Sequence, residues 1–294
     1  MAVDYIRPPD LEQALAAGGR PGAVYLGGGT DLLVPGDPRR EGATLLVSLR
    51  DVKELRALDR LPDGRFFIGA MNTHARLAAS PEIQGRFCAL AEACGSVGSA
   101  PIRAAATVGG NLCNAAPSAD AASPLLLYDA ELVLRDRERT WGLPLRRFFT
   151  GPGLTVLEPG HLLLGIRVTP CAHPASGSAF RKISRRAAVD IALAGASALV
   201  ELENGVCARM VIALGAVAPT PVVVDGAGAL ARGRVLDDGL LAELADVADE
   251  TVCPITDIRA SADYRRRMVG VLVRDVAAEA WRRALAREER GLER

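Results

Sequence analysis

Two short glycine-rich stretches constrain the fold of this chain more than any other feature. The first, Tyr25-Leu26-Gly27-Gly28-Gly29-Thr30-Asp31-Leu32-Leu33, follows an apolar run that predicts a short strand. The second runs from Thr107 to Asp120 and is small, polar and punctuated by Gly109 and Gly110. Paired glycines permit positive φ and a close backbone approach, and exposed N–H groups in such a turn bind an anionic phosphate. Two such loops can hold one ligand from both sides.

Neither stretch carries a familiar nucleotide motif. The Gly-x-Gly-x-x-Gly fingerprint of the dinucleotide-binding Rossmann unit is missing from both, and neither contains the Gly-Lys-Ser/Thr of a P-loop. Taken alone, the second stretch is equally consistent with an ordinary Gly-Gly turn followed by an Asx-rich loop. Together the two stretches indicate nucleotide binding of a third kind.

The charge and cysteine content narrow the class of protein. The 294 residues include 35 basic and 35 acidic side chains, which gives no electrostatic basis for a nucleic-acid or membrane partner. No C-x-x-C pair occurs, so the six cysteines indicate free thiols in a reducing compartment. The N-terminus lacks a signal-peptide pattern and no apolar run is of membrane-spanning length, so we expect a cytoplasmic protein. No metal site is legible, and His74 is expected on a helix surface.

Strand and helix signals predict the organisation of the chain. Asp10 is a candidate N-cap for a helix at 11–17, and strands are expected at 23–26 and 44–48, which makes a small α/β subdomain. The first glycine loop then lies at a strand's C-terminal end, where ligands favour binding. A linker at 171–177 marks the main boundary. We therefore expect domains at 1–174, with subdomains of about 1–52 and 53–174, and at 175–294.

The remaining elements are predicted from hydrophobic periodicity. One helix is expected at 82–95, and an Asn204-Gly205 hairpin signal separates alternating runs that suggest an antiparallel sheet. Two helices follow, at 238–252 and from Ala262 onward. The cluster Tyr264-Arg265-Arg266-Arg267 is expected to be a solvated helix start.

In combination, several segments resemble the FAD-binding medium subunit of the molybdenum hydroxylases, the group of xanthine, carbon monoxide and nicotinate dehydrogenases. The resemblance covers nearly the whole chain. It is carried by these segments: Gly27 to Leu32, Ile102-Arg103, Thr107 to Asn111 with Pro117 and Asp120, Phe148 to Gly153, Leu162-Leu163, Arg181-Lys182, Ser184 to Arg186 with Asp190, and Asp257 to Arg265.

The resemblance implies an α+β fold: a two-part FAD-binding domain of the vanillyl-alcohol-oxidase type, followed by an α+β C-terminal domain with an antiparallel sheet and helices. It places FAD in this chain, with the diphosphate in the two glycine loops and Leu163 against the flavin ring. Val97 and Asp120 would lie around the nucleotide, with Lys182 and Asp190 on a segment bordering the isoalloxazine. The implied cofactor-binding residues are Leu26, Gly27, Gly28, Gly29, Thr30, Asp31, Leu32, Val97, Thr107, Gly109, Gly110, Asn111, Asp120, Leu163 and Lys182.

Two positions depart from the family pattern. Ala116 stands where a serine commonly precedes the proline, and His161 stands where an acidic residue is usual. One hydrogen bond to the cofactor is then missing or supplied by Ser118. The cysteine-bearing insertion of hydroxybenzoyl-CoA reductases is missing, so no iron–sulfur cluster is expected in this chain.

The function implied is electron transfer. A molybdenum cofactor on a large subunit would oxidise the substrate, and [2Fe-2S] clusters on a small subunit would pass electrons to the FAD and on to an external acceptor. The expected assembly is a heterotrimer or its dimer, and this chain would have no catalytic acid or base. Two alternatives stay open: a self-sufficient FAD-dependent oxidase or reductase, and an assembly subunit without flavin.

Overall fold

The computed structural model describes residues 3–171, 173–186 and 189–292, and these residues form two compact units. Unit 1 comprises Met1–Arg76, Ala100–Ala115 and Asp129–Thr169. Unit 2 comprises Leu77–Ser99, Ala116–Tyr128 and Pro170–Arg294. Each unit is therefore made of three separate segments of the chain. The boundary predicted near residue 174 divides the chain only once, and it stays a prediction.

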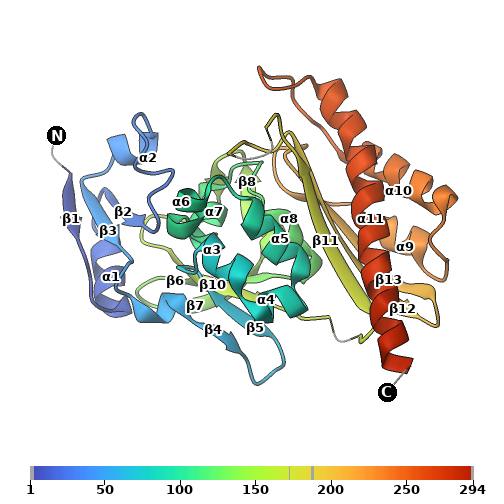
Figure 1. Cartoon of the computed structure of the whole chain (residues 1–294). Helices are drawn as coiled ribbons and strands as arrows, with labels where there is room; N and C mark the ends of the chain where they lie inside the picture. The colour runs from blue at the N-terminus through green and yellow to red at the C-terminus, as the bar shows by residue number, and fades with distance from the viewer. Residues whose placement is uncertain (1–2, 172, 187–188, 293–294) are drawn as a thin grey trace. The chain divides into compact units, whose positions relative to one another are not determined.

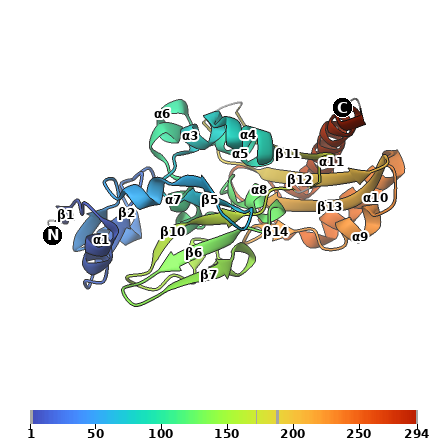
Figure 2. The same cartoon turned by 90° about the horizontal axis from the view of Figure 1, so that it is seen from below.

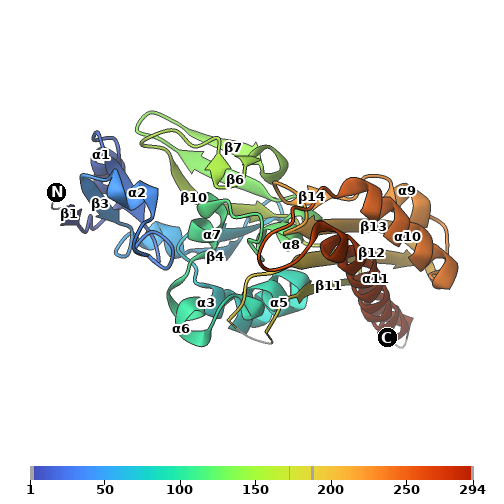
Figure 3. The same cartoon turned by 90° about the horizontal axis from the view of Figure 1, so that it is seen from above.

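A small parallel sheet opens unit 1. Its strand order is β1-β3-β2, formed by Asp4–Ile6, Leu45–Ser48 and Ala23–Leu26. Helix α1 (Leu11–Gly18) begins at Asp10, whose carboxylate accepts a hydrogen bond from the N–H of Gln13 at 2.8 Å. Figure 3 shows these elements together near the N-terminus, with the short helix α2 (Pro38–Glu41) beside them. The strand, helix and strand predicted here are confirmed.

A five-stranded antiparallel sheet is the second layer of unit 1, and its strand order is β4-β5-β10-β6-β7 (Figure 2). The strands are Leu58–Arg60, Phe66–Gly69, Leu162–Val168, Glu131–Arg135 and Thr140–Pro144. The pairing of β10 with β6 shifts register between Leu163 and Gly165. A bulge of this kind re-aims side chains, and both Leu162 and Leu163 are buried here.

Short elements complete unit 1. They are the 3₁₀ helices η1 (Lys53–Arg56) and η2 (Leu145–Arg147), the helices α6 (Ala100–Ala105) and α7 (Val108–Asn114), and the strand pair β8 (Phe149–Gly151) and β9 (Leu154–Thr155). Helix α3 (His74–Ala79) begins in unit 1 and ends in unit 2.

Unit 2 is built on a four-stranded antiparallel sheet of order β11-β12-β13-β14. Its strands are Ser176–Ile183, Ala194–Glu203, Val206–Gly215 and Val222–Val223. The β12–β13 hairpin turns at Asn204 and Gly205, which have φ of 52° and 76°. These values match the positive φ that a tight hairpin turn requires, so the hairpin prediction is confirmed.

Helices cover both faces of this sheet. The helices are α4 (Pro81–Arg86), α5 (Cys88–Ser96), α8 (Ala122–Leu127), α9 (Ala227–Ala231), α10 (Asp238–Thr251) and α11 (Ala262–Leu292). Gly177 of β11 faces α11, which lies along the strands in Figure 1. The next residue, Ser178, is hydrogen-bonded to the N–H of Ala89 on α5 and to the hydroxyl of Tyr128. Neighbouring strand residues point to opposite faces, so β11 is packed on both sides.

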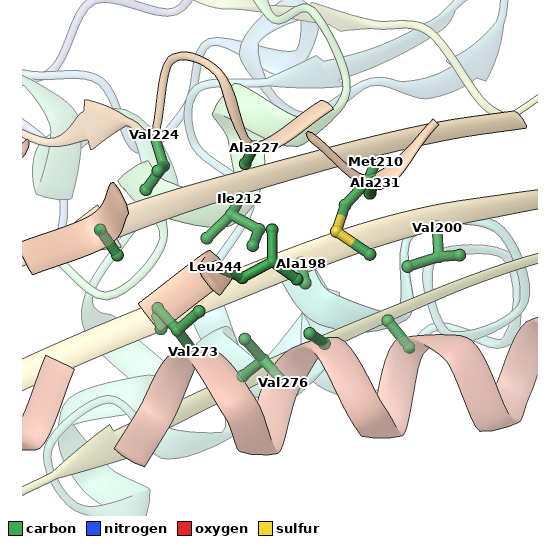
Figure 4. Close-up of a cluster of buried hydrophobic side chains, with 14 of the residues drawn as sticks. Ala198, Val200, Met210, Ile212, Val224, Ala227, Ala231, Leu244, Val273 and Val276 are labelled. Atoms are coloured by element: carbon green, nitrogen blue, oxygen red, sulfur yellow. The ribbon is translucent and has the colours of Figure 1, made fainter. Parts of the chain in front are cut away.

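The core of unit 2 lies between the sheet and helices α9 to α11. Figure 4 shows Val273 and Val276 of α11 pointing toward Leu244 of α10 and toward Ala198 of β12. All four side chains are fully buried. The two C-terminal helices predicted from sequence are therefore confirmed as the cover of an antiparallel sheet.

One predicted helix is two helices in the structure. Helix α4 ends at Arg86 and helix α5 begins at Cys88, with Phe87 between them at φ −132° and ψ 50°. The ring of Phe87 is fully buried and packs edge-on against Tyr128, with ring centroids 5.0 Å apart. Burying this ring accounts for a break that the hydrophobic periodicity does not reveal.

The contact of β11 with α11 gives a stability prediction. A Cβ at Gly177 would lie 2.1 Å from the carbonyl oxygen of Ala280, and backbone atoms cannot move aside cheaply. We expect Gly177→Ala to lower the free energy of unfolding by about 1–3 kcal/mol. The matched control is Gly85→Ala in α4, where a Cβ would meet nothing within 4 Å and is expected to stabilise by about 0.5–1 kcal/mol. Urea unfolding measures both, and equal stability of the two variants would contradict the prediction.

Candidate functional site

The first glycine loop has backbone N–H groups available for a ligand. It leaves the C-terminal end of β2 and reverses at Gly29, whose φ is +74°. The N–H of Leu33 donates to the carbonyl of Gly29 at 3.1 Å and closes the turn. Within the described residues, the N–H groups from Gly27 to Thr30 form no intramolecular hydrogen bond. A row of free N–H groups in a turn attracts an anion.

The second stretch differs from the prediction. It is not an open loop, because Thr107 is the N-cap of helix α7 and both glycines lie in its first turn. The N–H groups of residues 108–111 are all engaged. Val108 donates to the carbonyl of Asn72 (2.9 Å), Gly109 to that of Ala70 (2.9 Å), Gly110 to the Thr107 hydroxyl (3.1 Å) and Asn111 to the Thr107 carbonyl (2.9 Å). These four N–H groups are therefore bonded within the chain, and the binding of a phosphate by this stretch stays a prediction.

The two stretches lie against each other within unit 1. A Cβ on Gly28 would stand 2.0 Å from the carbonyl oxygen of Ala105, just before the second stretch. A Cβ on Gly27 would stand 3.1 Å from the hydroxyl oxygen of Thr107. Gly28 is thus required by close backbone approach, and that approach brings the two stretches together.

Gly109 and Gly110 play different parts. A Cβ on Gly109 would lie 2.8 Å from the carbonyl oxygen of Ala70, so this glycine is required by packing. A Cβ on Gly110 would meet only the Thr107 hydroxyl, at 2.9 Å, and Gly110 is exposed. Gly110 therefore lies on the open side of the second stretch.

Two further residues of unit 1 suit a dinucleotide. The side-chain oxygen Oδ1 of Asn111 is buried and has no hydrogen-bond donor within the described residues. An acceptor of this kind is satisfied by a donor such as a ribityl or ribose hydroxyl. Leu163 is an apolar side chain at the bulge of β10 and is 3% exposed. The residues of unit 1 therefore fit FAD in chemistry.

The remaining predicted site residues belong to unit 2, where they form a buried ion pair. The ammonium of Lys182 donates to the carboxylate of Asp120 at 2.5 Å and to the carbonyl of Ser96 at 2.9 Å. The side chains of Lys182 and Asp120 are 11% and 9% exposed. Because Val97 follows Ser96 directly, the fold gathers Val97, Asp120 and Lys182 into one cluster.

The electrostatics of this cluster are set by burial. Burial raises the pKa of Asp120 from its ordinary value of 3.8 to about 6, and Lys182 opposes this only in part. Asp190, the other residue of the segment implied by the resemblance, accepts hydrogen bonds from the N–H groups of Arg186 and Ile191. Its pKa is lowered, because these bonds outweigh its burial.

His74 is a residue that sequence reasoning misplaced. It is fully buried, so the expectation of a helix-surface residue is wrong. Burial, with a smaller effect of Arg103, lowers the pKa of His74 to about 4, so the ring is neutral at pH 7. Its backbone N–H donates to the carbonyl of Ala106 at 3.0 Å, next to Thr107. His74 thus supports the second stretch.

The described residues contain neither a metal site nor a membrane-spanning helix. Among the described residues, no three His, Cys, Asp or Glu side chains lie close enough to hold a metal ion. No helix in those same ranges is long and apolar enough to cross a membrane.

Comparison with known proteins shows the class of protein to which this chain belongs. Residues 1–170 match the family model "FAD binding domain in molybdopterin dehydrogenase", and residues 178–280 match "CO dehydrogenase flavoprotein C-terminal domain". The xanthine dehydrogenase FAD-binding subunit of Escherichia coli O157:H7 is 33% identical over 260 residues, covering 88% of this chain and 89% of that one. The carbon monoxide dehydrogenase medium chain of Afipia carboxidovorans is 31% identical over 283 residues, covering 96% and 97%.

A solved structure agrees with this class. A chain of the carbon monoxide dehydrogenase from Hydrogenophaga pseudoflava superposes with a TM-score of 0.90 at 29% identity, covering 96% of this chain and 98% of that one. The chain belongs to the family of FAD-binding subunits of molybdenum hydroxylases. The predicted family, the fold class, FAD as the cofactor of this chain and its role in an oxidoreductase are confirmed.

The raised pKa of Asp120 gives a pH prediction. A folded-state pKa of about 6 means that the folded chain binds a proton between about pH 4 and 6 that the unfolded chain releases. This contribution to stability is complete below about pH 4 and is lost as the pH rises through 6. We expect the unfolding free energy of the native sequence, minus that of Asp120→Asn, to fall over this range in urea titrations. A difference that is flat with pH would refute the shift.

Proposed function

We propose that the first glycine loop binds the FAD diphosphate through the N–H groups of Gly27, Gly28, Gly29, Thr30 and Asp31, flanked by Leu26 and Leu32. The observation that carries this proposal is the contact between Gly28 and the carbonyl of Ala105, which presses the loop onto the second stretch. The N–H groups from Gly27 to Thr30 have no partner in the part of the chain that the structure describes, and a diphosphate would supply the acceptors that they lack.

The second stretch takes a different role in this proposal. Its N–H groups are bonded within the chain, so Thr107, Gly109 and Gly110 are held in place beside the diphosphate. The Asn111 side chain accepts a hydrogen bond from a cofactor hydroxyl. Leu163 excludes water from one side of the flavin ring. From the family resemblance, Val97, Asp120 and Lys182 of unit 2 are proposed as further cofactor-binding residues, with the Lys182 ammonium as a fixed positive charge.

The activity we propose is electron transfer. When bound, FAD would supply the redox chemistry by accepting electrons from iron–sulfur clusters of a partner subunit and passing them to an external acceptor. The chain's own residues bind the cofactor, orient it and shield it from water. No catalytic acid or base is assigned to this chain.

The assembly we propose is a heterotrimer or its dimer, in the cytoplasm. A large subunit would carry the molybdenum cofactor, and a small subunit would carry [2Fe-2S] clusters. The names of the relatives support a division of labour, since one is a medium chain and another an FAD-binding subunit.

Gly110 offers a direct test of cofactor binding. In Gly110→Val the added side chain stands on the open side of the second stretch, so we expect loss of bound FAD by at least tenfold while the chain still folds, with about 1 kcal/mol lost at the Thr107 N-cap. Released FAD is measured by absorption and chromatography after co-purification with the neighbouring subunits. The matched control is Gly239→Val, because this exposed first-turn glycine of α10 also faces its N-cap side chain, with a Cβ 3.3 Å from Asp237 Oδ1.

The outcomes separate the three functions considered. FAD lost from Gly110→Val but kept in Gly239→Val, with reduction by substrate only in the complex, supports electron transfer. Equal FAD in both variants contradicts the placement of the cofactor at this stretch. Flavin reduced by substrate or NAD(P)H in the lone native chain would identify a self-sufficient enzyme, and no flavin in either preparation an assembly subunit.

A further inference from the structure

Arg265 is a buried cation that the cofactor site does not use directly. It lies in the first turns of α11 and is 4% exposed, so the expectation of a solvated helix start is wrong for this residue, whereas Tyr264 and Arg267 are exposed. Its Nη2 donates to the carboxylate of Asp257 at 2.8 Å. Hydrogen bonds from the N–H groups of residues 259 and 260 and from Arg265 overcome burial and hold the pKa of Asp257 well below its ordinary value. A buried guanidinium whose counter-charge is fixed is held rigidly, and its two terminal nitrogens, Nη1 and Nη2, form a fork of N–H donors.

The other arm of this fork reaches two backbone segments. Nη1 of Arg265 donates to the carbonyl of Leu193 at 2.8 Å and to the carbonyl of Ala216 at 3.4 Å. Ala216 directly follows β13 and has a φ of 64°, a strained value for a residue with a side chain. The guanidinium thereby ties the segment that precedes β12 to the segment that follows β13.

Leu193 and Ala216, whose carbonyls bind Arg265, each donate a hydrogen bond to a segment that carries one member of the Lys182–Asp120 pair. The N–H of Leu193 donates to the carbonyl of Ile183 at 2.8 Å, and Ile183 is the neighbour of Lys182 on β11. The N–H of Ala216 donates to the carbonyl of Pro117 at 2.7 Å, one turn before Asp120. Two short chains of hydrogen bonds therefore run from Arg265 to the segments that carry the ion pair, one ending at Ile183 beside Lys182 and the other at Pro117, three residues before Asp120.

We propose that Arg265 is a positioning residue for the Lys182–Asp120 pair, and through it for FAD. Its guanidinium binds the carbonyls of Leu193 and Ala216, and the N–H groups of these two residues bind the segments that carry Lys182 and Asp120. Arg265 therefore fixes the separation of the two segments. The consequence for FAD rests on the proposed function, whereas the positioning of the pair is a property of unit 2 alone.

The test measures the coupling of Lys182 and Asp120 without any cofactor. Lys182→Met, Asp120→Asn and the double variant, unfolded in urea, give the coupling factor in the unfolding equilibrium constant. We expect Arg265→Lys to reduce this factor at least tenfold, because one ammonium cannot reproduce the fork. The matched control is Arg266→Lys, since the neighbouring Arg266 donates to the carbonyls of Asp249 and Val252 and to the Asp249 carboxylate, none of which leads to the pair.

The outcomes distinguish positioning from simple stabilisation. An unchanged coupling factor in Arg265→Lys overturns the inference, even if that variant is less stable. A reduced factor with an unchanged dissociation constant for FAD upholds the positioning of the pair and overturns the proposed place of the pair at the cofactor. If Arg265→Lys does not fold, Asp257→Asn takes its place, because it removes only the counter-charge of the fork and is expected to reduce the factor in the same direction.

Discussion

The close approach of Gly28 to the carbonyl of Ala105 is the constraint on which the proposed cofactor site of unit 1 depends. A Cβ there would stand 2.0 Å from a backbone oxygen, a distance that no rotamer change relieves. In this contact, the N–H groups from Gly27 to Thr30 have no hydrogen-bond partner among the described residues. Free donors are costly unless water or a ligand satisfies them, so the same contact that shapes the loop prepares it for an anion.

Thr107 links this contact to the rest of unit 1. Its hydroxyl oxygen accepts a hydrogen bond from Gly110 as the N-cap of α7 and lies beside Gly27 of the first loop. The bonds of Val108 and Gly109 to the carbonyls of Asn72 and Ala70 then fasten α7 to the segment that follows β5. The N–H groups of residues 108–111 are thus bonded within unit 1, and this part of the second stretch supports the first loop.

Much of the fold could be predicted because it depends on local signals. The N-cap at Asp10, the hairpin at Asn204-Gly205 and the apolar periodicity of α11 are each read from adjacent residues. The break at Phe87 could not be predicted, because it depends on a ring buried against Tyr128, which lies 41 residues further along the chain. The burial of Arg265 was missed for a similar reason: its partners Leu193 and Ala216 are distant in sequence.

The candidate site could likewise be predicted only in part. Glycine spacing and resemblance identified both stretches, but spacing cannot tell whether an N–H group faces a ligand or a carbonyl 36 residues earlier, as at Val108. The ion pair of Lys182 with Asp120 joins residues 62 positions apart, and resemblance named both without indicating that they are partners.

The Lys182–Asp120 pair is better explained by function than by stability. Removing two charges from water costs several kcal/mol per ion, and an apolar pair of similar volume often stabilises a fold at least as well. Burial raises the pKa of Asp120 despite the adjacent ammonium, which indicates that the attraction does not fully offset the loss of solvation. Unit 2 nevertheless gives the Lys182 ammonium a second acceptor, the Ser96 carbonyl, and Arg265 ties together the segments that carry the pair. An arrangement that costs stability and is held this firmly is expected where the position of a charge matters, as beside a redox cofactor.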